Sequence, residues 1–209
     1  MDIRQILVGA FLGGVVALAW AKQPHAVKTV VHQMNIGPCH FSLSDPYKGE
    51  TSWPTGGLYS AVIKPKARHP YLTEIQFSCE NPATPETYLT SSIKLTERGW
   101  KLDTSHGDSG APGVNTTLYL LHGRGWEGAG TTQDQTNGDE RRRSRAFTFC
   151  IPHRQLALCG SIPTVAYLMW PKESVLPQVI KLLESIEFID TPEQAASSVP
   201  ATSQPDERR

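Results

Sequence analysis

The sequence predicts an α+β fold in which an antiparallel sheet of about six or more strands is packed by two helices. Three observations support this prediction. Most segments rich in β-branched and aromatic residues follow one another through short turns, as the strands of hairpins do, rather than alternating with helices. A helical stripe of apolar residues lies late in the chain. The length of 209 residues fits one domain with short appendages.

The two ends of the chain predict segments outside the folded body. Residues 6–21 read ILVGAFLGGVVALAWA, and Ala19 and Ala21 form an A-x-A cleavage site, so we expect residues 1–21 to be a signal peptide. The alternative is an uncleaved inner-membrane anchor, in which Gly9 and Gly13 could pair helices. Both outcomes place the body, residues 22–190, in the periplasm. Residues 191–209 are rich in Pro, Ser and Thr and predict a disordered tail.

The first half of the body predicts four strands and one helix. An opening hairpin is expected over 27–34 and 39–43, around the Gly37-Pro38 turn, and two further strands over 58–63 and 71–77. The first helix is expected over about 85–98. Its start is indicated by Thr84 as the N-cap and Pro85 at the first helical position, and Gly99 can end it.

The second half predicts five strands, a loop and a closing helix. The strands are expected at 100–102, 116–122, 145–151, 156–159 and 164–169. Residues 128–144 are polar and Gly-rich, which predicts a long exposed excursion between two strands. Ser174 is expected to cap the closing helix, whose apolar stripe faces the sheet and consists of Leu176, Val179, Ile180, Leu183 and Ile186.

The four cysteines of an exported domain predict two disulfides. Residues 147–160 predict a hairpin that turns near Arg154, and in that register Cys150 lies opposite Cys159. This favours the pair 150–159 and leaves Cys39 with Cys79, while two other connectivities remain open. A zinc site built from all four thiolates is the rival interpretation, but the spacings do not resemble C-x2-4-C.

Several classes of activity find little support in the residues. Twenty basic and twenty acidic side chains give no net charge, so nucleic-acid binding is not expected. No metal-binding spacing of His residues and no phosphate-binding loop is present, so we expect no metal and no cofactor. The string HGDSGAPG around Ser109 resembles the nucleophile segment of serine proteases, but its context favours turns between strands. A serine hydrolase is therefore only a third hypothesis.

An arginine-rich run provides the candidate binding site. Residues 139–145 read DERRRSR and follow closely on Gly123-Arg124-Gly125-Trp126-Glu127. Arginines can make bidentate contacts with carboxylates or phosphates, and a nearby indole can anchor a partner. A solubilising loop is the alternative. The candidate partner-binding residues are Arg124, Trp126, Glu127, Asp139, Arg141, Arg142 and Arg143.

The chain resembles the exported immunity proteins that bacteria make against their own type VI secretion effectors. The resemblance rests on the export segment, on the block CHFSLSDP from Cys39 to Pro46, and on ERGWKLD, RAFTFCI and LLESIEFID. The chain also resembles the PsbP/DcrB-like α+β sandwich of bacterial envelope proteins. It departs from the lipid-anchored members, because no lipobox Cys is present.

The resemblance implies a protein without catalysis that binds a cognate toxin in the periplasm and blocks it. The leading hypothesis is therefore an immunity protein whose excursion, about residues 124–145, inserts into or covers the toxin. The alternative is an envelope structural or chaperone-like binding module. Residues 6–21 would add an inner-membrane association if they are retained.

Overall fold

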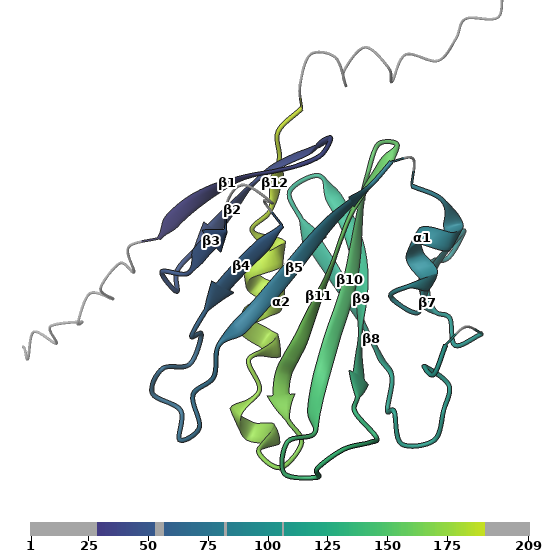
Figure 1. Cartoon of the computed structure of the whole chain (residues 1–209). Helices are drawn as coiled ribbons and strands as arrows, with labels where there is room; N and C mark the ends of the chain where they lie inside the picture. Colours follow the sequence, from purple (N-terminus) through teal and green to yellow (C-terminus); the bar gives the residue numbers. More distant parts are fainter. Residues whose placement is uncertain (1–28, 53–56, 82, 106, 191–209) are drawn as a thin grey trace, which may run out of the picture.

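A seven-stranded antiparallel sheet forms the centre of the molecule (Figure 1). The computed structural model describes residues 29–190 except 53–56, 82 and 106. The strand order is β3-β4-β5-β11-β10-β9-β8. The predicted sheet of six or more antiparallel strands is confirmed, and two short α-helices accompany it. Its strands are β3 (Glu50–Ser52), β4 (Leu58–Ala61), β5 (Thr73–Glu80), β8 (Thr117–Gly123), β9 (Trp126–Asp134), β10 (Ser144–His153) and β11 (Leu156–Tyr167).

A second layer packs on one face of this sheet. It consists of helix α2 (Leu176–Glu184) and a three-stranded sheet of β1 (Val30–Ile36), β2 (Cys39–Asp45) and β12 (Glu187–Phe188). Four of the five residues of the predicted stripe are buried: α2 buries Leu176, Val179 and Leu183, and Ile186 after its end is also buried, whereas Ile180 is half-buried. The main core therefore lies between the two layers, where these apolar side chains pack against the apolar side chains on the facing side of the large sheet and are shielded from water.

The first helix is shorter than predicted. Helix α1 (Pro85–Leu89) begins as expected after Thr84, but the chain then forms the hairpin β6 (Ile93–Thr96) and β7 (Gly99–Leu102). The helix ends at Leu89, Ser92 with a φ of +53° completes the turn that leads into β6, and Ile93 is fully buried on the other face of the large sheet. Packing of this β-branched residue outweighs the weak helical pattern.

The predicted excursion over 128–144 is wrong for its first half. Residues up to Asp134 belong to β9, and the loop is limited to residues 135–143. Gly130 lies opposite Phe149, and a Cβ atom on Gly130 would come within 2.6 Å of the Phe147 ring. The Phe147 ring of β10 therefore covers Gly130, and the middle of β9 is buried although it carries no large apolar residue.

Both favoured disulfides are formed. Cys39–Cys79 joins β2 of the small sheet to β5 of the large sheet, and Cys150–Cys159 joins the neighbouring strands β10 and β11. The four-thiolate zinc site is therefore wrong. The predicted export segment, residues 1–21, and the predicted tail, residues 191–209, lie outside the described residues.

The end of the described chain is fixed to the turn between β10 and β11. The carboxylate of Asp190 accepts a hydrogen bond from the Arg154 guanidinium at 2.6 Å, and it lies 2.7 Å from His153 Nε2. The His153 ring stacks on Phe188 of β12. These contacts hold the final strand against the body at one end of the large sheet.

Candidate functional site

Three connections meet at the opposite end of the large sheet, which is the lower end in Figure 1. Residues 62–72 join β4 to β5, residues 135–143 join β9 to β10, and residues 168–173 follow β11 and include the short helix η1 (Pro171–Glu173). We call these three connections the basic end. They carry seven Lys or Arg residues and three Asp or Glu residues, although the whole chain has no net charge.

The basic end contains an open hollow of about 490 Å³. Aromatic rings line much of its wall. His69 stacks on Trp170 with ring centroids 3.9 Å apart, Trp170 meets Tyr167 edge to face at 5.8 Å, and Tyr167 meets Tyr71 at 5.3 Å. The remaining lining residues are Pro70, Thr164, Arg141 and Arg142. A connected set of rings and two guanidinium groups therefore share one surface.

Hydrogen bonds hold the aromatic wall in place. The carboxylate of Glu173 accepts the backbone N–H of His69 and lies 3.2 Å from the His69 Nδ1 atom. The Tyr71 hydroxyl donates to the Val165 carbonyl at 2.8 Å, and burial raises the pKa of Tyr71 to about 12. Tyr71 is therefore protonated at neutral pH, and the wall is built before any partner arrives.

The loop over residues 135–143 is fixed at its base. The Arg145 guanidinium makes two hydrogen bonds to the Asp134 carboxylate, at 2.6 and 2.9 Å, and Asn115 donates a third at 3.1 Å. Burial raises the pKa of Asp134, but these donors outweigh burial and hold its pKa below the ordinary value. The backbone N–H of Leu168 also donates to the Arg143 carbonyl, which connects this loop to the exit from β11.

Two of the predicted partner-binding residues lie in the hollow, and two support it. Arg141 and Arg142 are exposed and line the hollow. Asp139 shapes the loop, because its carboxylate accepts the backbone N–H of Arg141 at 3.0 Å. Arg143 is half-buried and donates to the Gly138 carbonyl while lying 3.7 Å from Glu140. Its guanidinium is thus directed into its own loop.

The other three predicted residues lie at the far end of the sheet. Arg124 and Glu127 are exposed there and pair with Glu187 and His122, respectively. Trp126 is buried in the core, and its indole N–H donates to the Ile186 carbonyl at 2.9 Å. The expectation that Trp126 anchors a partner beside the arginines is therefore wrong. The nine residues of β9 separate the two groups by roughly 27 Å.

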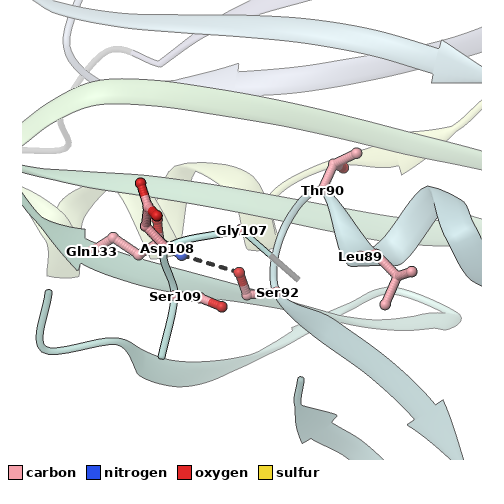
Figure 2. Close-up of a pocket in the computed structure, with 7 residues that line it drawn as sticks. All are labelled: Leu89, Thr90, Ser92, Gly107, Asp108, Ser109 and Gln133. Atoms are coloured by element: carbon pink, nitrogen blue, oxygen red, sulfur yellow. Dashed lines mark hydrogen bonds between the residues drawn. The ribbon is translucent and has the colours of Figure 1, made fainter. Parts of the chain in front are cut away.

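A second hollow, of about 340 Å³, contains Ser109 (Figure 2). As predicted, the described residues around Ser109 form turns, with the Ala111 N–H donating to the Asp108 carbonyl. Ser109 is 5% exposed, and the dashed line in Figure 2 is the hydrogen bond from Gln133 to Ser92. The described lining residues are Leu89, Thr90, Ser92, Gly107, Asp108, Ser109 and Gln133, which include no imidazole base.

Sequence reasoning missed the aromatic wall. His69, Tyr71, Tyr167 and Trp170 come from two segments almost 100 residues apart, and only the pairing of β5 with β11 brings these segments together. A usable signal was present in the sequence. His69-Pro70-Tyr71 lies at the start of one predicted strand and Met169-Trp170-Pro171 at the end of another, and each combines an aromatic side chain with a turn-forming Pro.

Comparisons with known proteins assign the chain to no family. No protein-family model matches the sequence, and no curated protein matches it. Within the part of the chain that the structure describes, no three His, Cys, Asp or Glu side chains are grouped so as to hold a metal ion. Residues 29–190, with the gaps given above, include no helix that is long and apolar enough to cross a membrane.

Proposed function

We propose that this protein is a non-enzymatic binding protein of the periplasm that neutralises a secreted antibacterial toxin, and that the basic end contacts the toxin. The observation that carries the proposal is the combination, at one end of a disulfide-bonded sheet, of exposed arginines and a pre-built aromatic wall. Arginine and aromatic side chains dominate the binding energy of protein interfaces. An acidic surface on the toxin is the expected counterpart.

Two further elements belong to the same proposal. The disulfides fit an oxidising compartment, which agrees with the predicted export segment. The resemblance to immunity proteins against type VI effectors supplies the toxin class, and the two-layer arrangement of sheet and helix is compatible with a PsbP/DcrB-like sandwich. An immunity role therefore unites the oxidising compartment and the binding surface in one hypothesis.

Charge reversal at the hollow tests the proposal. Cells that express a candidate antibacterial toxin would receive the wild-type chain, the double variant Arg141→Glu/Arg142→Glu, or the control Arg98→Glu/Lys101→Glu on the exposed β6–β7 hairpin. We expect the wild type and the control to protect the cells. The double variant should bind the toxin at least tenfold more weakly, since like charges then face each other.

Two outcomes would contradict the proposal. One is full protection by the double variant. The other is that the wild-type chain, purified from its native host, carries only components of a transport or assembly system. The second result would favour the envelope structural or chaperone-like module.

A further inference from the structure

The charged groups that remain available in the hollow are two guanidinium groups, which only donate hydrogen bonds. The nearby carboxylate of Glu173 is already used by His69, and the Lys64 ammonium group donates to the Ser174 carbonyl. In contrast, the side chains of Arg141 and Arg142 take part in no ion pair or hydrogen bond with any residue that the structure describes. A ligand with negatively charged acceptors therefore matches the unpaired charges of this hollow.

The wall beside these arginines is suited to a flat or apolar group. Trp170 and His69 present stacked rings, and Tyr167 closes the set at right angles to Trp170. Aromatic faces of this kind pack well against another ring or a long aliphatic chain. Within about 490 Å³, the hollow thus offers cationic groups that match a negative charge and aromatic faces that match an apolar or flat group.

Exposed aliphatic side chains surround the same end. Val62 is 41% exposed, Leu72 is 54% exposed and Met169 is 53% exposed, and all three belong to the connections of the basic end. A carbohydrate would leave these side chains in water, whereas the surface of a protein partner can cover them. A bilayer would cover them too and carries anionic phosphates, but a flat surface fills a concave site less completely than a projecting side chain does, and vesicles therefore serve as a competing probe below.

We propose that the hollow receives an Asp or Glu side chain that the partner carries beside an aromatic residue. The carboxylate lies between Arg141 and Arg142, and the neighbouring ring packs on Trp170. This inference rests on the proposed function and specifies its contact: an acidic and aromatic segment of the toxin inserts at the basic end.

A short peptide tests this contact without the toxin. The probe is acetyl-Gly-Glu-Phe-Glu-Gly-amide, and its matched control has Gln in place of both Glu residues. The readout is the indole N–H resonance of Trp170 in ¹⁵N-labelled protein, assigned with Trp170→Phe. We expect a saturable shift with the acidic peptide and at least tenfold weaker binding of the Gln peptide.

Variants of the protein locate the binding. Arg141→Gln/Arg142→Gln should lower the affinity for the acidic peptide at least tenfold. The control variant Arg98→Gln/Lys101→Gln should leave this affinity unchanged. Equal binding of the two peptides, or no shift of the Trp170 resonance, would overturn the inference. A stronger response to phosphatidylglycerol vesicles or to N-acetylmuramic acid than to the acidic peptide would also overturn it.

Failure of this inference and failure of the proposed function give different results. If the acidic peptide does not bind but Arg141→Glu/Arg142→Glu still abolishes protection, the basic end binds the toxin and the hollow is not the contact for an acidic side chain. If the peptide binds as expected but the wild-type chain gives no protection, the hollow has the stated chemistry and the immunity role is wrong.

Discussion

The carboxylate of Asp45 is fully buried and surrounded by donors. It accepts hydrogen bonds from the backbone N–H groups of Tyr47 and Gly49, each at 2.6 Å, and from the Tyr59 hydroxyl at 2.8 Å, while His32 Nε2 lies at 3.2 Å. Burial raises its pKa, but these donors outweigh burial and hold the pKa of Asp45 below its ordinary value. The ionised side chain therefore fixes the turn after β2.

We expect Asp45→Asn to lower the free energy of unfolding by about 2–4 kcal/mol, because an amide leaves at least one buried donor without an acceptor. Urea denaturation monitored by circular dichroism measures the change. Glu74→Gln on the exposed face of β5 is the control and should alter stability by less than about 0.5 kcal/mol. A loss equal to that of the control would show that the donors around residue 45 find water instead.

Gly160 on β11 is a second residue whose identity is dictated by close contact. A Cβ atom there would lie 2.6 Å from the Phe149 ring and 2.7 Å from the Gln76 carbonyl oxygen. We expect Gly160→Ala to destabilise the protein by about 1–3 kcal/mol through overpacking, although Ala is the less flexible residue. Thermal unfolding compares it with Ser161→Ala on the same strand, which should be nearly neutral. No difference between the two variants would contradict this interpretation.

The secondary-structure elements differ in how readily the sequence predicts them. The stripe of α2 and the hairpin of β10 and β11 are recognisable because their apolar periods are local. Most of strand β9 was missed, because its Gly and Thr residues are buried by neighbouring elements, as Gly130 is by Phe147 of β10, and carry no apolar pattern of their own. The end of α1 was also missed, since the burial of Ile93 depends on a sheet formed by distant residues.

The two disulfides act on different pairs of elements. Cys150–Cys159 connects strands that already share a long hydrogen-bonded ladder, and Cys39–Cys79 connects the two layers. Chain entropy predicts about 3.9 kcal/mol from the 40-residue loop and about 2.7 kcal/mol from the shorter one.

We therefore expect Cys39→Ala/Cys79→Ala to lower the urea midpoint more than Cys150→Ala/Cys159→Ala does. Hydrogen exchange should also be faster in β1 and β2 of the first variant, because these strands belong to the small sheet that this disulfide attaches. The reverse order of stabilities would contradict the model in which loop length and the linkage of layers determine the effect.

Over the whole molecule, the candidate site was predictable only in part. The arginines on the loop before β10 were recognised, since a run of charged residues between strands is visible in the sequence. The prediction that Trp126 lies beside these arginines was wrong. Trp126 begins strand β9 and the arginine loop follows its end, so the length of this strand separates them. Trp170 was missed because it reaches the arginines only through the order of strands in the sheet.

Acid should destabilise the whole fold through its buried carboxylates. The pKa values of Asp45 and Asp134 lie below the ordinary value in the folded state, so the unfolded chain takes up protons first as the pH falls. Their stabilisation is present above about pH 4 and is lost as the pH falls through the folded pKa values. We expect the urea midpoint to drop as the pH falls from about 4 toward 2, and to drop less in Asp134→Asn. A midpoint independent of pH over that interval would contradict this assignment.

The clasp of Asp190 on His153 and Arg154 has a practical consequence for protein engineering. It holds Asp190, the last residue that the structure describes, at the end of the large sheet opposite the pole that carries Trp170. A fluorescent reporter or an affinity handle inserted directly after Asp190 would be attached at the end of the sheet opposite the arginines, so immobilisation through it would present the arginine-bearing pole to the solution.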